Sequence, residues 1–392
     1  MRSTNTVGLG SPRSTVRVLV SRAFRSLAYG ALAVVFAAAL AYRGLSPFAI
    51  GALITVALLA GALTSSCTGR LVRRFGTRVT LAASGIAMTI AAALLAGNEP
   101  AIVVACLLGV VSPGAQDVGP FAAIEQVALA TDPAATTRRL SWYNVVSATA
   151  IAVGALLAAV VPFTGVLVLY GIAGAAVAVV AWGLPDVPIE AAPPLEPRPR
   201  SGTVDRLAAL FAVDAFAGGF VVQAFIAYWL TLRFGVGPQT IGPLLFGANL
   251  LAAISYLLAD RVAARIGLLN TMVFTHLPSN VLLVLVPFMP TFPLAAGVLL
   301  ARFALSQMDV PTRQAYTLAL VPPHDRARAA GVTAAVRPAA AAVAPMLTGI
   351  AFQFAALGLP FVFAGALKIV YDIVLLATFR HVPLDASRRA PG

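Results

Sequence analysis

The sequence predicts an all-α integral membrane protein with twelve transmembrane helices, arranged as two pseudo-symmetric bundles of six. Three observations favour this fold class. Of the 392 residues, 60% are hydrophobic and only 10% are charged, whereas soluble domains carry about 25% charged residues. Twelve long apolar runs recur along the chain, and short patterns in its first half return in its second half. Because the runs lack the alternation of a barrel strand, helices are the structure that satisfies the backbone in lipid.

Each apolar run is long enough to cross a hydrocarbon core of about 30 Å at about 1.5 Å per residue. The first six runs lie near residues 24–42, 46–68, 79–97, 101–129, 140–161 and 164–184. The second six lie near residues 205–232, 239–259, 268–289, 294–321, 329–352 and 358–379. The first run has no convincing cleavage site after it, so we expect a retained helix rather than a signal peptide.

A proline-rich polar stretch separates the two sets of runs. It contains the sequence PDVPIEAAPPLEPRPRSG, which cannot span a bilayer and is typical of a linker. The predicted organisation is an N-terminal six-helix bundle at residues 1–184, a cytoplasmic linker at 185–203 and a C-terminal six-helix bundle at 204–392.

Prolines and glycines predict local departures from straight, well-separated helices. Pro113 and Pro120 lie in the fourth run and Pro311 lies in the tenth. A proline inside a helix removes a backbone donor and kinks the helix, so we expect these bends to free carbonyls toward a cavity. Glycines such as Gly30 and Gly61 are expected to permit close approach between helices.

The basic residues predict the orientation. Placing the N-terminus inside puts most arginines on the cytoplasmic side, whereas Arg43 and Arg233 fall outside. Because positively charged loops face the cytoplasm, we expect a multi-pass protein of the plasma (inner) membrane with both termini cytoplasmic. The net charge of +13 is read as this topological signal, and no nucleic-acid partner is expected.

Two matches at nearly the same spacing indicate an internal repeat. The stretch Arg70-Leu-Val-Arg-Arg-Phe-Gly76 resembles Arg261-Val-Ala-Ala-Arg-Ile-Gly267. At nearly the same offset, Gln116-Asp117-Val118 aligns with Met308-Asp309-Val310. Together with the matching topology, these pairs predict a duplicated six-helix unit.

Residues 69–78, between the second and third runs, read GRLVRRFGTR. This stretch resembles the loop motif G-x-x-x-D-R-x-G-x-R of the major facilitator superfamily of secondary transporters, and the resemblance extends over essentially all twelve helices. The candidate motif residues are Gly69, Arg70, Arg73, Arg74, Gly76 and Arg78, with Arg73 at the position of the family's aspartate. In the family that aspartate helps to latch helix ends in the outward-facing state, so Arg73 puts this latch in question.

The resemblance implies that helices 1, 4, 7 and 10 line a central cavity. Four acids fall within these helices, namely Asp117, Glu125, Asp214 and Asp309. Asp117, Asp214 and Asp309 come out near mid-depth, where alternating-access carriers hold substrate and coupling ions. Such a carboxylate could load and release a proton as the cavity opens to either side. The alternative is a structural pair with a buried arginine, and for Glu125 we expect a gate or ion-pair role.

Arg313 and Arg337 are the cations expected either to neutralise these acids or to bind an anionic substrate group. Arg313 lies one turn after Asp309, which favours a local pair. Lys368 and Asp372, spaced i and i+4, are expected to neutralise each other. The remaining candidates for the cavity wall are Tyr29, Gln126, Gln223, Tyr228 and Gln314, for which helix packing is the alternative role.

Other chemistry is not indicated. Cys67 and Cys106 lie at opposite predicted depths, so we expect both to be reduced. His276 is expected to be a packed, hydrogen-bonded side chain. No Cys/His cluster predicts a metal site, and no phosphate-binding loop or activated nucleophile predicts a cofactor or an enzyme.

The sequence therefore predicts a secondary active transporter of a small organic solute, working by alternating access as a monomer in the lipid bilayer. Protons are the expected coupling partner, and the resemblance implies export. Two alternatives remain open. One is a proton-coupled uptake permease for a nutrient or an anionic metabolite. The other is a non-transporting receptor or scaffold on the same fold, which Arg73 favours.

Overall fold

The computed structural model describes residues 12–129, 133–184, 202–321 and 326–382. The chain divides into two compact units, here called unit 1 and unit 2. Unit 1 comprises Met1–Ala192 and Gln223–Phe246, and unit 2 comprises Pro193–Val222 and Gly247–Gly392. Of the predicted linker, residues 185–201 lie outside the described residues, and Gly202 already begins a helix.

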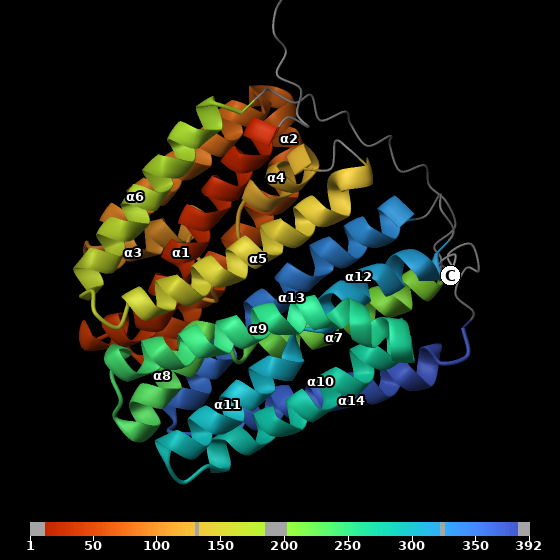
Figure 1. The fold of residues 1–392 in the computed structure, drawn as a ribbon. Helices are drawn as coiled ribbons and strands as arrows, with labels where there is room; N and C mark the ends of the chain where they lie inside the picture. The colour runs from red at the N-terminus through yellow and green to blue at the C-terminus, as the bar shows by residue number, and fades with distance from the viewer. Residues whose placement is uncertain (1–11, 130–132, 185–201, 322–325, 383–392) are drawn as a thin grey trace, which may run out of the picture. The chain divides into compact units, whose positions relative to one another are not determined.

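Unit 1 is an all-helical bundle built around its first helix. Its helices are α1 (Pro12–Tyr42), α2 (Pro47–Leu95), α3 (Glu99–Leu107), α4 (Phe121–Leu129), α5 (Pro133–Leu157), α6 (Phe163–Trp182) and α8 (Gln223–Phe234). Helix α1 packs against α5, α6 and α8, while α2 packs along α6 and α3 (Figure 1). Helix α1 therefore joins α5, α6 and α8 within this bundle.

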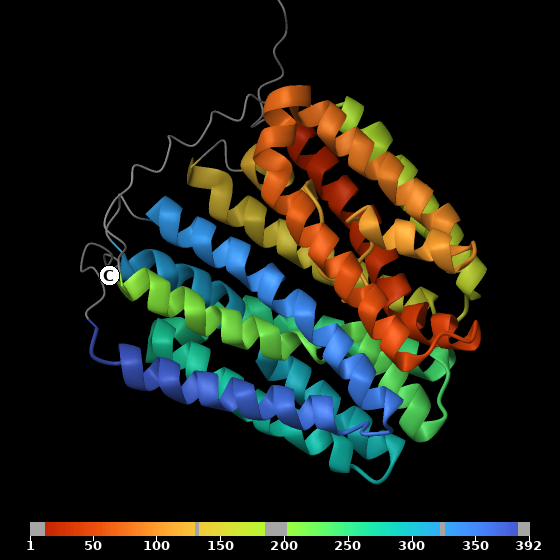
Figure 2. The ribbon, with the colours of Figure 1, turned by 180° about the vertical axis from the view of Figure 1, so that it is seen from behind.

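Unit 2 is a second all-helical bundle. Its helices are α7 (Gly202–Gly219), most of α9 (Pro238–Ile266), α10 (Leu268–Leu285), η1 (Val286–Phe288), α11 (Phe292–Ser306), α12 (Asp309–Leu320), α13 (Arg326–Gln353) and α14 (Leu359–Phe379). Helix α7 packs against α13 and α14, and α10 packs against α14, α11 and α12 (Figure 2). Phe211, Met272, Tyr316 and Tyr371 contribute to one buried apolar cluster, which joins α7, α10, α12 and α14.

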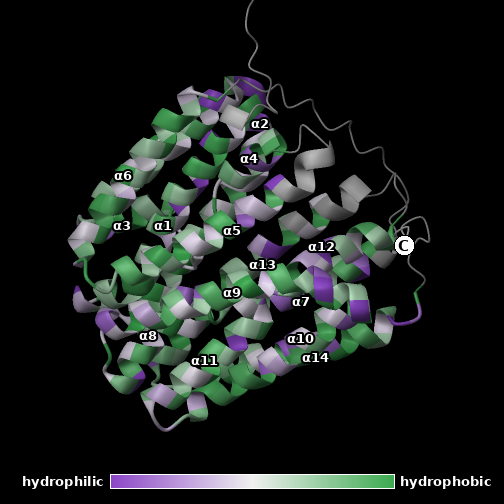
Figure 3. Ribbon diagram, in the orientation of Figure 1, coloured by the Kyte–Doolittle hydropathy of each residue, from purple (hydrophilic) through white to green (hydrophobic). Residues whose placement is uncertain are grey.

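The helices agree with the twelve predicted spans. In the described part of the chain, nine stretches are long and apolar enough to cross a membrane, and hydrophobic residues predominate along the helices of both units (Figure 3). The stretch Pro47–Leu95 holds two predicted spans, so these nine account for ten. The other two, predicted at 101–129 and 294–321, are each broken into two short helices.

The backbone repeats together with the sequence. Gly76 interrupts α2 with φ 81° and ψ 165°, and Gly267, the equivalent residue of the second half, precedes α10 with φ 86° and ψ 159°. Such left-handed angles favour glycine because it has no Cβ atom. The hydroxyls of Thr80 and Thr271 donate to the carbonyls of these two glycines at 2.7 and 2.8 Å. The two halves therefore share the same turn between their second and third helices.

Glycines bring α1 and α5 into close contact, as the sequence predicts. A Cβ atom added to Gly154 would lie 2.0 Å from the carbonyl oxygen of Leu27, and one added to Gly30 would lie 2.1 Å from that of Ile151. Small residues at such crossings let helix backbones approach closely inside a membrane. The α1 and α5 backbones therefore have no room for a methyl group at either position.

Gly154→Ala is expected to destabilise unit 1 because α5 must move away from α1. The matched control is Gly297→Ala on α11, where an added Cβ atom meets nothing within 4 Å. Alanine favours a helix over glycine by about 0.8–1.0 kcal/mol, so the control should be neutral or slightly stabilising. The measurement is thermal unfolding of the purified proteins in detergent. Equal unfolding temperatures for the two variants would contradict the close contact.

Candidate functional site

The fourth predicted span is unwound over residues 108–120, between α3 and α4. Gly109, Ala115 and Gly119 have φ angles of 69°, 55° and 78°. These left-handed residues turn the backbone away from a helical path, in the segment where the sequence predicts bends at Pro113 and Pro120. Asp117 therefore lies on irregular backbone within a membrane-spanning bundle.

Hydroxyl groups from neighbouring helices satisfy the carbonyls that this break frees. Tyr170 of α6 donates to the Val110 oxygen at 2.6 Å, and Ser65 of α2 donates to the Gly119 oxygen at 2.6 Å. The backbone N–H of Ala224 donates to the Pro113 oxygen at 3.1 Å. Irregular backbone at membrane depth is tolerated only where such partners exist.

A buried charge cluster in unit 1, which we call cluster 1, has its centre at Arg25 and Glu125. The Arg25 guanidinium forms a two-pronged bond with the Glu125 carboxylate, with N–O distances of 2.7 and 2.9 Å. Both side chains are fully buried. Ser21 and Tyr143 each donate a hydroxyl hydrogen bond of 2.7 Å to the same carboxylate. The Glu125 carboxylate is thus saturated with donors.

Asp117 completes cluster 1. It accepts a hydrogen bond from Arg22 and lies 3.3 Å from Nε of Arg25. Its side chain is 20% exposed, whereas that of Arg25 is fully buried. Two cations of α1 therefore face two acids of the fourth span, and the cluster has no net charge when all four are ionised.

A second cluster, which we call cluster 2, surrounds Asp214 of α7 in unit 2. Lys368 of α14 lies 2.5 Å from its Oδ1 atom, and Arg337 of α13 lies 2.9 Å from its Oδ2 atom. Arg313 of α12 lies 3.5 Å from the same Oδ2 atom. One carboxylate thus ties α7 to three other helices.

Two further acids belong to cluster 2. Asp309, the first residue of α12, bonds to Arg313 at 2.5 Å. It follows a second helix break, at residues 307–308 between α11 and α12. Asp372 of α14 accepts a hydrogen bond of 2.9 Å from Asn280 of α10, and its Oδ1 atom lies 2.9 Å from Nδ1 of His276 on the same helix α10. The break at residues 307–308 precedes Pro311 and lies close to the bend that the sequence predicts there.

The chain with these broken helices and buried acids also matches a known protein family. A family model described as Major Facilitator Superfamily matches residues 18–299. The chain belongs to this superfamily. An uncharacterized membrane protein of Saccharomyces cerevisiae is 27% identical over 185 residues, which are 47% of this chain and 41% of the yeast protein. The chain thus spans about two fifths of the length of this curated relative.

Solved transporter structures share the superfamily fold. The nucleoside transporter NupG has a TM-score of 0.72 at 11% identity, over 94% of this chain and 99% of that one. The xylose transporter XylE from E. coli has a TM-score of 0.73 at 12% identity, over 96% and 98%. The human organic anion transporter MFSD10 has a TM-score of 0.70 at 16% identity, over 93% and 100%. Membership of the superfamily and this shared fold support a multi-pass membrane protein and a secondary transporter of small molecules rather than an enzyme.

The pairing of the buried charges differs in part from the local pairs that the sequence suggests. Arg313 and Asp309 do bond to each other, as their spacing predicts. The predicted pair of Lys368 and Asp372 is wrong, because Lys368 bonds to Asp214 and Asp372 bonds to His276. Lys368 and Asp214 are far apart in the sequence and lie on different helices, and the fold brings them together.

Sequence reasoning missed Arg22 and Arg25 as partners of the fourth span. The orientation predicted above places them with the cytoplasmic arginines, whereas Arg25 is completely buried. A signal was present, because the two arginines lie three residues apart at the start of an apolar run and so share one face of a helix. Two acids without a local cation stood in another apolar run of the same half.

The remaining predicted candidates lie on four helices. Tyr29 is buried against Tyr170, with ring centroids 6.0 Å apart. Gln223 and Tyr228 are buried on α8 in unit 1. Gln126 and Gln314 are exposed on the surfaces of α4 and α12.

The motif residues of this superfamily member surround the Gly76 kink. Arg70, Arg73 and Arg74 are exposed, and the Arg78 guanidinium donates to the carbonyl oxygen of Leu184. A tight turn at Gly76 is thus present between the second and third predicted spans. Arg73, which stands at the position of the family's aspartate, is one of these exposed residues.

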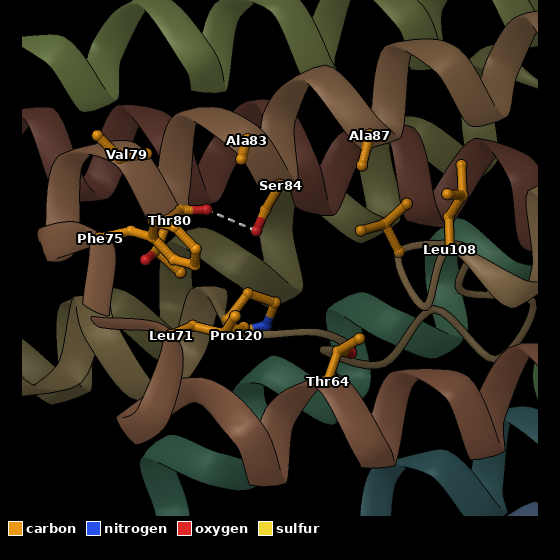
Figure 4. Close-up of a pocket in the computed structure, with 11 residues that line it drawn as sticks. Thr64, Leu71, Phe75, Val79, Thr80, Ala83, Ser84, Ala87, Leu108 and Pro120 are labelled. Carbon is orange, nitrogen blue, oxygen red and sulfur yellow. Dashed lines mark hydrogen bonds between the residues drawn. The ribbon is translucent and has the colours of Figure 1, made fainter. Parts of the chain in front are cut away.

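A largely apolar pocket of about 320 Å³ lies beside this kink. Phe75, Val79 and Ala83 of α2 line it together with Leu108 and Pro120 from the ends of the unwound segment (Figure 4). The Ser84 hydroxyl at its edge is already bonded to the carbonyl oxygen of Thr80, at 2.8 Å. No residue of cluster 1 lines this pocket.

Cys67 is partly buried and Cys106 is buried, and both are free cysteines. Among the residues that the structure describes, no group of three or more His, Cys, Asp or Glu side chains is arranged to hold a metal ion.

Breaking the central pair of cluster 1 is expected to destabilise the protein. Arg25→Met or Glu125→Gln alone should cost about 3–5 kcal/mol of unfolding free energy, since each leaves a buried charge without its partner. The double variant should recover much of this loss because both charges are removed. The measurement is the unfolding of the two single variants and the double variant in a denaturing detergent. Glu99→Gln, on the exposed first turn of α3, is the control. Additive losses in the double variant would argue against a specific pair.

Proposed function

We propose that this chain is a secondary active transporter that moves a small organic solute by alternating access and couples this movement to protons. The observation that carries the proposal is the placement of a charge-balanced buried cluster at a helix break in each unit. Asp117 lies on the unwound segment of unit 1, and Asp309 begins the helix after the break in unit 2. Transporters bind substrates and coupling ions at such discontinuous helices.

Charge balance supplies the physical link between a proton and a conformational change. An alternating-access carrier must pass through a state in which its cavity is closed to water on both sides. A buried cluster with a net charge is unfavourable in that state, because the surroundings have a low dielectric constant. Adding or removing one proton therefore changes which conformations are accessible, and a co-transported solute can compensate the charge.

The proposal also covers location and domain organisation. Both termini are proposed to lie in the cytoplasm of a cell whose plasma membrane holds the protein, supported by the arginine-rich cytoplasmic loops. The proposed moving bodies are the six-helix bundles of residues 1–184 and 204–392. A monomer is the proposed working unit.

Asp214→Asn is expected to lower solute-driven proton movement by about tenfold or more, since it leaves three cations of cluster 2 around a neutral amide. The measurement uses proteoliposomes that contain a pH-sensitive dye, exposed to D-xylose, uridine, benzoate or tetraphenylphosphonium. Asp205→Asn is the matched control, because Asp205 lies on the same helix α7 and is exposed. Wild-type protein that moves solute without any pH change would remove proton coupling from the proposal.

The proposed direction is export, which rests on the resemblance to superfamily exporters. Inside-out membrane vesicles with an acidic interior test it. Solute accumulation in these vesicles indicates export by exchange with protons. Accumulation in right-side-out vesicles with an acidic exterior indicates uptake instead.

One observation favours a second candidate, the proton-coupled uptake of an organic anion. The Arg337 side chain is 27% exposed, whereas those of Arg313 and Lys368 are 9% exposed. Arg337 is therefore the cation of cluster 2 that a dissolved anion can reach most readily. A proton bound to the cluster would leave a positive charge for such an anion to neutralise.

Arg337→Gln tests this second candidate. It should raise the KM for benzoate by about tenfold, the loss expected when one charge-assisted hydrogen bond is removed. Transport of the neutral probe D-xylose, if present, should change little. Unchanged benzoate kinetics would exclude Arg337 as the anion-binding group.

A further inference from the structure

We propose that His276 is the proton-binding residue of this carrier, with Asp372 and Asn280 as positioning residues and Asp214 as the acceptor that senses the proton. This inference rests on the proposed proton coupling and assigns it to one imidazole. The sequence predicts only a packing role for His276 and assigns the coupling proton to the acids Asp117, Asp214 and Asp309.

The imidazole of His276 lies between two carboxylates. Its Nδ1 atom is 2.9 Å from Oδ1 of Asp372, and its Nε2 atom is 3.8 Å from Oδ1 of Asp214. The ring is 5% exposed and lies edge-on to the Tyr371 ring, at 6.1 Å between centroids. A neutral imidazole has a single N–H and can donate to one carboxylate. An imidazolium can donate to Asp372 and, at 3.8 Å, also forms an ion pair with Asp214. The site is therefore complementary to the protonated ring.

The hydrogen-bond network indicates which nitrogen receives the proton. Asn280 Nδ2 donates to Asp372 Oδ2 at 2.9 Å and lies 3.2 Å from Nδ1 of His276. Nδ1 lies 2.9 Å from Asp372 Oδ1, and an ionised carboxylate can only accept a hydrogen bond. This arrangement favours the tautomer in which Nδ1 of His276 carries its hydrogen and donates it to Asp372. The lone pair is then on Nε2, which faces Asp214. The added proton binds to Nε2 and forms an N–H directed at Oδ1 of Asp214.

A charge count explains why the histidine, and not an acid, changes the charge of cluster 2. Besides the histidine, the charged and titratable groups of cluster 2 are Asp214 of α7, Asp309 and Arg313 of α12, Arg337 of α13, and Lys368, Tyr371 and Asp372 of α14. Three ionised acids and three cations cancel when the histidine is neutral. A histidine is the side chain whose ordinary titration falls between about pH 5 and 8. Protonation of His276 gives the cluster one positive charge without breaking any of these ion pairs first.

The added proton affects Lys368 because His276 and Lys368 face the same oxygen atom of Asp214. Oδ1 of Asp214 is also the atom that Lys368 bonds, at 2.5 Å, so a protonated His276 competes with Lys368 for it. The Lys368 ammonium group lies next to Gly218, where an added Cβ atom would be 3.7 Å away. Gly218 is in the last turn of α7, directly before the break between α7 and α8. Protonation thus alters the contact that holds α14 to the end of α7.

A protein with a single histidine tests the proposal without any substrate. The chain has three histidines, so His324→Gln with His381→Gln leaves His276 alone. With labelled imidazole in lipid nanodiscs, nuclear magnetic resonance over about pH 9 to 5 should show the Nδ1–H tautomer at the high end and an imidazole with hydrogen on both nitrogens as the pH is lowered. In this background Asp372→Asn should reduce the Nδ1–H population, which a role in helix packing alone would not require. An imidazole that stays neutral throughout this range would overturn the proposal.

Transport separates this proposal from the proposed function. His276→Gln should retain movement of the active probe solute (D-xylose, uridine, benzoate or tetraphenylphosphonium) down its own gradient. It should lose solute-driven proton movement by about tenfold or more, and solute flux should no longer depend on pH. His381→Gln, at an exposed position after α14, is the control. Wild-type proton movement in His276→Gln overturns the role of His276 and leaves proton coupling intact, whereas wild-type protein without proton movement refutes the coupling itself.

Discussion

The need to pair the buried charges of the two clusters is the constraint on which the rest of this structure depends. An isolated charge in a membrane-embedded bundle is strongly unfavourable, and so is a backbone carbonyl without a donor. Asp214 meets this need by binding Lys368, Arg337 and Arg313 from three helices. The same rule holds for the backbone at the breaks, where the Thr348 hydroxyl donates to the Phe220 oxygen at 2.9 Å. The irregular segments are stable because the surrounding helices provide their partners.

The two units pair their buried charges with opposite arrangements of acids and cations. In unit 1 the cations Arg22 and Arg25 are on the first helix and the acids are on the fourth span. In unit 2 the acid Asp214 is on the first helix of the repeat, and its three cations are on later ones. The repeated backbone, with its matching turns at Gly76 and Gly267, therefore supports two different electrostatic sites. Only the site of unit 2 includes a histidine.

Much of the fold could be predicted from the sequence because its determinants are local. Hydropathy locates each span, since lipid requires about 20 apolar residues in a row to cross it. The turn at Gly76 follows from a motif of ten residues, and the bends near Pro113 and Pro311 follow from single prolines. These features need no information about which helices lie next to each other.

The candidate site was harder to predict because its pairs join distant parts of the chain. Arg25 and Glu125 are 100 positions apart, and Lys368 and Asp214 are 154 apart. A local rule could only pair Lys368 with Asp372, one turn away, and this pairing is wrong. The rotation of each helix about its axis decides the same question for amides, so Gln126 and Gln314 are exposed while Gln223 is buried. Packing against neighbouring helices sets that rotation, and a single sequence does not encode it in a readable pattern.

The two-pronged contact between Arg25 and Glu125 has an evolutionary consequence. Neither residue can be exchanged for a neutral one without leaving the other charge buried and unpaired. A lineage can therefore change this position only by passing through an unstable intermediate, or by replacing both residues nearly at once. Among descendants of the same ancestral gene, these two sites should accordingly be inherited as a single unit, gained or lost together.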